Sequence, residues 1–535
     1  MIVQSNMSVL LEVTNPLFEE ARDVLSGFAE LKKSPEYMHT YKITPLSLWN
    51  AASSGTGAED VVASLKKYTK HALPEAVVAN ILSISDRYGK VRLIEESGRY
   101  YLECDDDATS LEVRTALKAP KEGRLEVSSI FRGEMKQILL KIGYPVADLA
   151  GYGAATGFSI PLKKSFVPRW YQQEATDAFH AGGSVTGGSG VIVLPCGAGK
   201  TMVGITVMEK VGAETLILTT GITALRQWRD ELLDKSCLLP DSIGEYSGAI
   251  KQIRPVTITT YKTLTQRKSK NDPFIHFELF SRRNWGLIIY DEVHMLPAPV
   301  FRATSEIQSK RRLGLTATLV REDGLEGDVF SLIGSKKYDL PWKVLEKAGY
   351  IAEAGCTEVR VPLTGKERHE YSVAEKRDKF RIAAENKRKL AALMDLLEKH
   401  SDDNILIIGQ YVDQLRSISN IIDAPLITGN TKNAEREQLY AAFKRGEIRT
   451  LVLSKVANFA IDLPDANVAI EVSGAFGSRQ EEAQRLGRIL RPKPDDNRAW
   501  FYTLVSDDTI EMDFSAKRQM FLTEQGYKYA ITKLE

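Results

Sequence analysis

Apolar runs and helix-like segments alternate along the chain from about residue 166 onward. Each run is rich in Val, Ile, Leu and Thr, and the segments between them, such as TALRQWRDELLDK, space their apolar residues three or four apart. One series of runs reads GVIVLP, ETLILTT, PVTITTY, WGLIIYDE and RRLGLTAT, and a second reads DNILIIG, APLITG, TLVLSK, NVAIEVS and AWFYTLV. Strands that alternate with helices indicate a parallel sheet with crossover helices, so the pattern predicts two α/β domains in tandem.

The N-terminal third has a mixed pattern. PEAVVANILSISDRYGK has helical spacing, KVRLIEES and RYYLECD predict a hairpin around Ser97-Gly98, and a helix within IFRGEMKQILLK should end before Gly143 and Pro145. The charged, aromatic stretch Lys366–Leu390 predicts a helical insertion in the second α/β domain. We expect a small α+β domain, a small connector module and the two α/β domains, over residues 1–118, 119–165, 166–340 and 341–535.

Composition narrows the class of protein. The chain has 535 residues, 43% of them hydrophobic, and 71 Lys and Arg against 70 Asp and Glu, for a net charge of +1. A near-neutral chain has no global field that attracts polyanions or membranes, so a polyanion site would have to be local. No apolar run approaches the ~18 residues of a membrane span, and the four cysteines form no CxxC pair. We therefore expect a cytoplasmic protein without a zinc or iron–sulfur centre and without a membrane partner.

The first candidate site is the stretch VIVLPCGAGKT, in which glycines follow a strand and precede a helix. Backbone N–H groups of such a loop bind phosphate oxygens, and the helix N-terminus adds positive potential. Lys200 would then reach the β- and γ-phosphates of ATP, and the Thr201 hydroxyl would bind Mg²⁺. The strict pattern has glycine where Leu194 stands, which leaves a simple tight turn as the alternative. The predicted nucleotide contacts are Leu194, Pro195, Cys196, Gly197, Ala198, Gly199, Lys200 and Thr201.

A pair of acids supports the nucleotide interpretation. WGLIIYDEVH places Asp291 and Glu292 at the end of a buried strand about 90 residues after Lys200. In phosphoryl-transfer sites the first acid holds Mg²⁺ and the second orients or deprotonates the attacking water. An acidic turn after a core strand is the alternative, but it leaves the pairing with GAGKT unexplained. His294 is either a packed loop histidine or a link to the TAT triplet Thr316-Ala317-Thr318.

A third element, QRLGRILRP, places Gln484, Arg488 and Arg491 on one helical face. Arginines so placed are commonly a solvated surface. Alternatively, they reach the γ-phosphate and stabilise transition-state charge. The second domain has no glycine-rich loop of its own, so the second possibility predicts one nucleotide site for both domains.

Taken together, these motifs resemble superfamily 2 helicases, and specifically the XPB-type DNA repair helicases in a short form, over essentially the whole chain. The resemblance implies two RecA-like domains, and in that family the first glycine of the loop is commonly replaced, as by Leu194. RWYQQ is similar to the upstream glutamine motif, which implies that Gln172 contacts adenine. KVANFAIDLPDANVAIEVS resembles motif V and implies a nucleotide contact for Asp462, although Ala460 stands where many relatives have glycine.

The resemblance also implies DNA contacts. LTTGITALRQW and TITTYKTL match DNA-strand motifs, and TATLVRED contains the family's RED motif; the residues implied are Thr220, Gln227, Thr260, Tyr261, Arg321, Glu322 and Asp323. The Lys366–Leu390 stretch looks like a short form of the family's thumb, and eight Lys and Arg against four Asp and Glu from Arg368 give it a local charge of +4, which suits phosphate contacts. HTYKITPLSLWNA and YGKVRLIEESGRYYLE are similar to the family's N-terminal region, and the connector would be a DNA-recognition-like module.

The resulting hypothesis is an ATP- and Mg²⁺-dependent 3′–5′ DNA helicase or translocase that acts in DNA repair and grips DNA without sequence preference. Three alternatives stay open: a motor on RNA, a translocase that does not separate strands, and a DNA-binding platform that ATP switches and that recruits a nuclease. No nuclease constellation is apparent in the sequence, so any incision would come from a nuclease partner.

Overall fold

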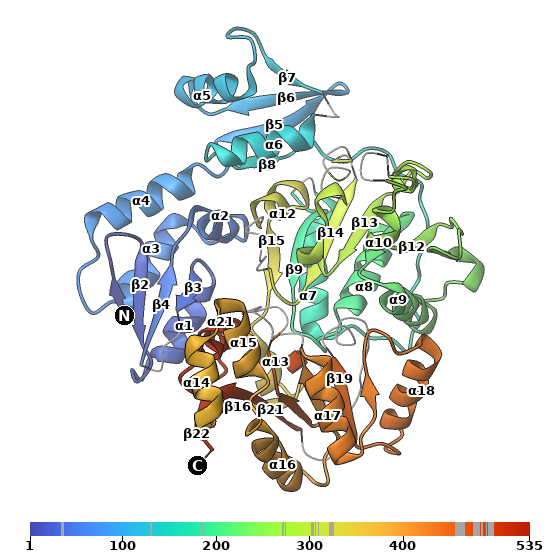
Figure 1. Cartoon of the computed structure of the whole chain (residues 1–535). Helices are drawn as coiled ribbons and strands as arrows, with labels where there is room; N and C mark the ends of the chain where they lie inside the picture. Colours follow the sequence, from blue (N-terminus) through green and yellow to red (C-terminus); the bar gives the residue numbers. More distant parts are fainter. Residues whose placement is uncertain are drawn as a thin grey trace. The chain divides into compact units, whose positions relative to one another are not determined.

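The computed structural model of the chain describes residues 1–33, 37–128, 131–184, 186–269, 272, 274–300, 304, 307–308, 310–319, 326–454, 466–474, 482, 485–487, 489–490 and 497–534. Contacts divide the chain into two compact units. The first contains residues 1–194 and 199–340, and the second contains residues 195–198 and 341–535. Each unit is described separately, with the element labels of Figure 1.

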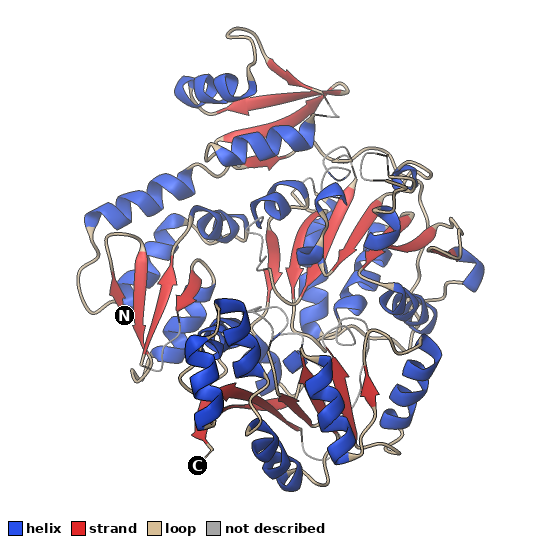
Figure 2. Cartoon of the chain, in the orientation of Figure 1, coloured by secondary structure: helices blue, strands red, loops and turns tan. Residues whose placement is uncertain are grey.

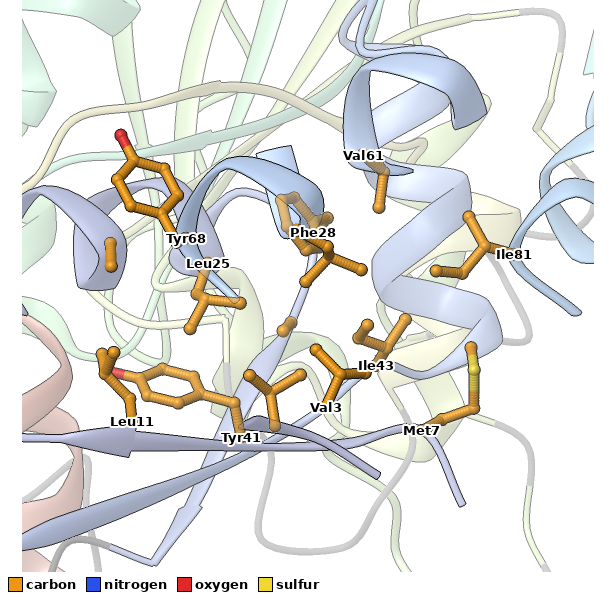
Figure 3. Packing of buried hydrophobic residues seen from close by; sticks show 14 of the residues in the cluster. Val3, Met7, Leu11, Leu25, Phe28, Tyr41, Ile43, Val61, Tyr68 and Ile81 are labelled. Carbon is orange, nitrogen blue, oxygen red and sulfur yellow. The ribbon is translucent and has the colours of Figure 1, made fainter. Parts of the chain in front are cut away.

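The first unit begins with a small α+β fold. Its sheet has the strand order β1-β2-β4-β3 within the described residues, with antiparallel pairing throughout. One face of the sheet packs on helices, and residues such as Leu25, Tyr41 and Val61 meet in the core between them (Figure 3). The elements are β1 (Ile2–Val3), β2 (Ser8–Glu12), α1 (Phe18–Ser26), β3 (Glu30–Lys33), β4 (Met38–Lys42), α2 (Pro45–Ser53), α3 (Ala58–Tyr68) and α4 (Glu75–Asp86).

A second small sheet follows, with the order β7-β6-β5-β8. The predicted hairpin is confirmed: β5 and β6 pair antiparallel across Ser97 (φ 52°) and Gly98 (φ 81°), a turn that favours residues tolerating positive φ. The helix predicted before Gly143 is also present. The boundary expected at residue 118 falls inside this sheet, and a boundary between α4 and β5 would keep both small sheets whole. The elements are β5 (Val91–Glu96), β6 (Arg99–Cys104), α5 (Asp107–Leu117), β7 (Leu125–Val127), α6 (Arg132–Lys141) and β8 (Val146–Asp148).

The rest of the first unit is built on a parallel sheet of order β11-β12-β10-β13-β14-β9-β15 in the described part of the chain. All five strands predicted here are present. Their residues are buried almost continuously, as expected of strands covered on both faces. The strands are β9 (Ser189–Val193), β10 (Thr215–Thr219), β11 (Ile243–Tyr246), β12 (Val256–Thr260), β13 (Leu287–Asp291), β14 (Arg311–Thr316) and β15 (Lys336–Asp339).

Helices flank this sheet (Figure 2). α8 follows β9 directly and contacts β13, β14, α7 and α9, so the loop before it lies at the carboxyl end of the sheet. β9 is connected to β10 through α8, and β10 to β11 through α9, which are helical crossovers of the kind that the alternating pattern predicts. The helices are α7 (Trp170–His180), α8 (Lys200–Val211), α9 (Ile222–Lys235), α10 (Tyr261–Leu264) and α12 (Glu326–Leu332).

The second unit contains another parallel sheet, whose described strands have the order β18-β19-β17-β20-β21-β16-β22. The two α/β domains expected from the pattern are therefore both confirmed. The strands are β16 (Glu353–Val361), β17 (Ile405–Gly409), β18 (Leu426–Ile427), β19 (Thr450–Ser454), β20 (Val468–Glu471), β21 (Arg498–Ser506) and β22 (Tyr529–Lys533).

The predicted insertion is helical, as two short helices that break at Ala374-Glu375 and are followed by a third. Thr364 caps the first of them by accepting the Glu367 N–H, while the Glu367 carboxylate accepts the Thr364 N–H, which is a capping box. The helices of this unit are α13 (Trp342–Lys347), α14 (Gly365–Val373), α15 (Lys376–Ala384), α16 (Lys389–Lys399), α17 (Val412–Ile422), α18 (Asn433–Lys444) and α21 (Ile510–Glu524).

Candidate nucleotide and DNA site

The glycine-rich loop connects β9 to the first residue of α8, which is Lys200. Gly197 (φ 81°) and Gly199 (φ 78°) both have left-handed backbone conformations that suit glycine. Leu194 is fully buried, and its N–H donates to the carbonyl oxygen of Thr316 over 3.0 Å. Leucine at this position therefore serves the sheet core, while the turn itself is made by the two later glycines.

Gln172 lies against this loop. The side chain is buried on α7, and a Cβ built on Gly199 would approach its Nε2 to 2.6 Å. Its Oε1 accepts the Arg169 N–H over 2.9 Å, which fixes the orientation of the amide. The structure thus brings the predicted adenine contact and the phosphate loop together.

The acidic pair follows β13 at the same edge of the sheet. Glu292 has a left-handed backbone conformation (φ 50°), a strained state for a residue other than glycine that is common at functional sites. Its Oε1 is 3.6 Å from Lys200 Nζ, and its Oε2 is 3.4 Å from His294 Nδ1. Burial alone would raise the pKa of Glu292, but Lys200, His294 and the Ala317 N–H outweigh it and hold that pKa below its ordinary value. Glu292 is consequently ionised at neutral pH.

Asp291 is in a different environment from its neighbour. Burial first, and then the adjacent Glu292 charge, raise the pKa of Asp291 to about 6. The indole N–H of Trp228 donates to its Oδ2 over 3.0 Å, and the Tyr261 hydroxyl donates to its backbone carbonyl over 2.8 Å. These two bonds fix the carboxyl group at the end of the strand. Burial opposes the ionisation of this carboxyl group, so a nearby cation would stabilise its charged form.

His294 connects the acidic pair to the end of β14. Its Nδ1 is 2.7 Å from Thr316 Oγ1, which in turn donates to the Thr318 carbonyl over 2.5 Å and accepts the Thr318 N–H over 3.1 Å. Of the two interpretations of His294, the link to the TAT triplet therefore matches the contacts. A change at the acidic pair can reach the segment after β14 through this chain of hydrogen bonds.

The residues predicted to contact DNA differ in exposure. Thr220 and Gln227 are partly exposed, after β10 and on α9. Thr260 is buried and caps α10 by accepting the Thr263 N–H over 3.1 Å. Tyr261 is buried as well and supports Asp291, so the contacts of these two side chains are structural.

Seven predicted residues lie outside the described residues, and their positions are predictions from sequence alone: Arg321, Glu322, Asp323, Asp462, Gln484, Arg488 and Arg491. Their described neighbour Arg485 is part of a buried ion cluster. Arg485 pairs with Glu471 at the end of β20, and Arg518 Nη2 lies 3.0 Å from the same carboxylate. The cluster ties Arg485 to the end of β20 in the second sheet.

The sequence did not indicate two of the supporting residues. In the sequence, Trp228 is simply one residue of ALRQW, and Glu471 is one polar residue in an apolar strand, so neither pattern indicates a role. Each acquires its role from a partner that is remote in the sequence: Trp228 from Asp291, and Glu471 from Arg485 and Arg518. Tryptophan among helix surface residues and a carboxylate inside a buried strand are the signals that could have drawn attention to them.

Comparison with protein families gives three matches. The family described as ERCC3/RAD25/XPB C-terminal helicase matches residues 345–535. Residues 1–127 match a family described as helicase conserved C-terminal domain. Residues 165–321 match the type III restriction enzyme res subunit family.

Curated relatives cover nearly the whole chain. A Mycobacterium tuberculosis protein named DNA 3'-5' helicase XPB is 52% identical over 99% of this chain and 97% of its own length. A Kineococcus radiotolerans protein of the same name is 51% identical over 99% of this chain and 96% of its length. A Saccharomyces cerevisiae protein named general transcription and DNA repair factor IIH helicase/translocase subunit XPB/SSL2 is 32% identical over 99% of this chain and 71% of its length.

Solved structures with a similar fold include a restriction-enzyme fragment. This fragment of a putative HsdR subunit of a type I restriction enzyme from Vibrio vulnificus has a TM-score of 0.52 at 17% identity, over 70% of this chain and 69% of the fragment. The type ISP restriction-modification enzyme LlaBIII bound to DNA has a TM-score of 0.50 at 11% identity, over 70% of this chain and 31% of its own. These similarities concern the fold alone.

Proposed function

Because this chain belongs to the XPB family of DNA helicases, we propose that it is an ATP-driven 3′–5′ DNA helicase that acts in DNA repair. Full-length relatives named as DNA 3'-5' helicases support the activity. The yeast relative is named as a subunit of a DNA repair factor, which supports the repair role. The observation that carries the proposal is the Lys200–Glu292 pair beside Asp291, at the carboxyl end of one parallel sheet.

The side chains of the site divide the work of ATP hydrolysis. Lys200, at the N-terminus of α8, neutralises phosphate charge together with the N–H groups of the loop. Glu292 is ionised and partly exposed, so it can orient the attacking water and accept its proton. His294 and the Ala317 N–H hold the Glu292 carboxylate in place. Gln172 supports the loop and contacts the adenine base.

Mg²⁺ fits the donor set at this site. Asp291 supplies a carboxylate and Thr201 a hydroxyl, and Mg²⁺ is usually held by one or two carboxylates together with the phosphates. In the described part of the chain, no three His, Cys, Asp or Glu side chains gather into a metal site, so the nucleotide would have to complete the coordination. A Mg²⁺ ion there supplies charge neutralisation on the phosphate oxygens.

For DNA, we propose contacts at the carboxyl edge of the first parallel sheet. Thr220 and Gln227 are accessible there, and Arg321, Glu322 and Asp323 follow β14 in sequence. Thr260 and Tyr261 would act indirectly, by holding the ends of β12 and β13. Backbone contacts without base readout suit a motor that must work on any sequence.

Two further proposals concern a partner and a location. We propose a nuclease partner for any incision step, since the chain carries no nuclease constellation of its own. We also place the protein in the cytoplasm. Within the described residues, no helix combines the length and the apolar character that a bilayer span requires.

Strand displacement on tailed duplexes tests the proposal. We expect ATP-dependent separation of duplexes with a 3′ tail but not a 5′ tail, and ATPase activity that DNA stimulates more than RNA. Glu292→Gln should lower kcat by about 100-fold or more and retain ATP binding, since general-base groups contribute ~10²–10⁴ in rate. Glu209→Gln, the same change at an exposed position of α8, is the matched control.

Other outcomes would point to the alternatives. DNA-stimulated ATPase activity without strand separation would indicate a translocase. The yeast relative is named as a helicase/translocase subunit. Stronger stimulation by RNA than by DNA would indicate an RNA motor. Normal turnover in Glu292→Gln would remove Glu292 from the reaction and contradict the proposed site.

A further inference from the structure

A polar cavity lies in the first unit, where the second small sheet meets the parallel sheet. It has a volume of about 230 Å³. Its lining includes Lys136 from α6, Asp148 from β8, Arg312 from β14, Lys337 from β15, and Ser335 just before β15. Gln137 of α6 donates to Asp328 of α12 over 2.7 Å, a contact that holds these parts of the unit together. None of these side chains belongs to the proposed ATP site.

The single carboxylate among the described lining residues is already engaged. Asp148 accepts from Arg132 Nε over 3.0 Å and Nη2 over 2.5 Å, and from Lys136 Nζ over 2.8 Å. Both cationic side chains are almost entirely buried, at 2% and 5% exposure. Two buried cations therefore share one carboxylate.

Arg312 adds a third buried cation, at 1% exposure. Its side chain donates to neutral groups: the carbonyl oxygens of Leu332, Gln308 and Lys310, and the Ser189 hydroxyl. Arg132 Nη1 is buried and has no hydrogen-bond partner among the described residues. With Lys337, three cations line the cavity beside one carboxylate, and Arg132 binds that same carboxylate. A buried cation without a counter-charge is costly.

The titration of Lys136 agrees with this excess of positive charge. Burial, opposed by Asp148 and reinforced by Arg312 and Arg132, lowers the pKa of Lys136 to about 8. An ordinary buried ion pair would keep its lysine firmly protonated. Positive charge therefore exceeds negative charge at the cavity. The hydrogen-bond donors of its lining side chains are hydroxyl groups and cationic groups.

We propose that this cavity binds a small tetrahedral oxyanion of the phosphate class. Lys136 of α6 and Lys337 of β15 would donate to it, and the charges of Arg132 and Arg312 would stabilise it. The volume fits one such anion with several waters, each of which takes roughly 30 Å³. Bound there, the anion would fasten the second small sheet to β14, the strand that ends at Thr316 beside the ATP site.

The phosphate group could come from inorganic phosphate or from a nucleotide. Calorimetric titration in the Lys200→Ala background separates this cavity from the ATP site, with chloride holding the ionic strength constant. We expect saturable binding of phosphate and of sulfate, which carries no titrating proton at neutral pH. ADP that binds in this background more tightly than phosphate, and loses that binding with Lys136→Met, would identify a nucleotide as the source.

Two variants in the Lys200→Ala background assign the binding to the cavity. Lys136→Met keeps the length of the side chain and removes one charged donor, so affinity should fall about ten-fold or more. Lys337→Met, at the β15 residue of the lining, should also weaken binding, and it keeps the test valid if Lys136→Met does not fold. Lys141→Met, at an exposed position of the same helix, is the control and should bind like its Lys200→Ala parent. The proposal is overturned if neither anion binds, or if Lys141→Met weakens binding as much as the two cavity variants do.

Discussion

At the scale of single residues, Gly199 is the most constrained position of the nucleotide loop. Its φ of 78° is left-handed, and a Cβ there would meet Gln172 Nε2 at 2.6 Å. Gly212 ends the same helix with a φ of 58°, but its Cβ would find only the Glu209 carbonyl oxygen, at 3.9 Å. The two glycines share the backbone requirement and differ in what a side chain would touch.

Replacing each glycine with alanine separates backbone strain from loop function. Both Gly199→Ala and Gly212→Ala should cost about 1–2 kcal/mol of unfolding free energy, because alanine is disfavoured at left-handed φ. Gly199→Ala alone should also lower kcat/KM for ATP by about ten-fold or more, since it displaces Gln172 from the loop. Chemical denaturation and steady-state ATPase measure the two effects. Equal losses of kcat/KM in both variants would mean that strain alone accounts for the change.

The residues proposed to act on ATP could be predicted because they lie within short, contiguous motifs. GAGKT and DEVH each place their functional groups within a few residues of a strand end, and the structure brings Lys200 and Glu292 together as that pattern predicts. Trp228 and Tyr261 could not be assigned in this way. Their roles depend on hydrogen bonds to Asp291 across 63 and 30 residues.

At the scale of elements, a buried ion cluster fixes the end of β20. Glu471 is fully buried and faces two guanidinium groups, those of Arg485 and Arg518. Without the Glu471 charge, Glu482, whose Oε2 is 3.5 Å from Arg518 Nε, would be the one carboxylate of the described ion pairs left for two buried guanidinium groups. An uncompensated buried charge typically costs about 3–5 kcal/mol. The exposed pair Arg445–Glu447 has the same two residue types but is surrounded by solvent.

The same substitution at both sites measures the effect of burial. Glu471→Gln should lower the unfolding free energy of the second unit by about 3 kcal/mol, and hydrogen exchange should show the loss in the amides of β20. Glu447→Gln should leave the unfolding midpoint unchanged, because exposed ion pairs are screened. A Glu471→Gln protein with parental stability and exchange would show that the cluster is not needed to hold the strand.

The Lys136 cluster on α6 predicts a pH dependence of stability. The pKa of Lys136 is about 8 in the folded chain, against 10.5 for a free side chain. Between these values the unfolded chain binds more protons than the folded one, so stability should rise as the pH rises from about 8 to 10.5. Below pH 8 both states are protonated, and the cost of the buried charge is present in full.

Urea unfolding of the parent and Lys136→Met at pH 7.5 and 9.5 measures this contribution. The variant should be the more stable protein at pH 7.5, and its advantage should shrink at pH 9.5 as the parent lysine loses its proton. Burial also lowers the pKa of Lys337 at the same cavity, but Lys337 is present in both proteins, so its own titration affects both alike. A difference that stays constant between the two pH values would contradict the lowered pKa.

Most elements of the two α/β domains could be predicted because buried parallel strands are continuous apolar runs. The strands that were not predicted have other patterns. β11 (IGEY) is a four-residue edge strand, and β15 (KKYD) and β22 (YAITK) are edge strands with exposed or half-buried side chains. β16 carries Glu358 and Arg360 among its apolar residues. Such strands are defined by pairing with a neighbour, which a local pattern does not contain.

At the scale of the whole molecule, the question is whether two α/β domains turn over ATP as a motor or bind it as a switch. The first sheet bears the loop and both acids. The sequence resemblance predicts that the second domain contributes Gln484, Arg488 and Arg491. Arg485, a described residue near them in sequence, pairs with Glu471 of the second sheet. A switch needs nucleotide affinity alone, whereas a motor also needs charge stabilisation in the transition state.

Arg488→Lys distinguishes a motor from a switch. A guanidinium can bind two phosphoryl oxygens at once, whereas lysine presents one compact charge, so lysine should be a poor replacement. Because arginines of this kind contribute ~10³–10⁵ in rate, DNA-stimulated kcat should fall far more than the affinity for ATP or DNA. Measuring all three quantities separates catalysis from binding. If Arg488 were a solvated surface residue, kcat would stay within a few-fold of the parent, and the second domain would then have no demonstrated part in hydrolysis.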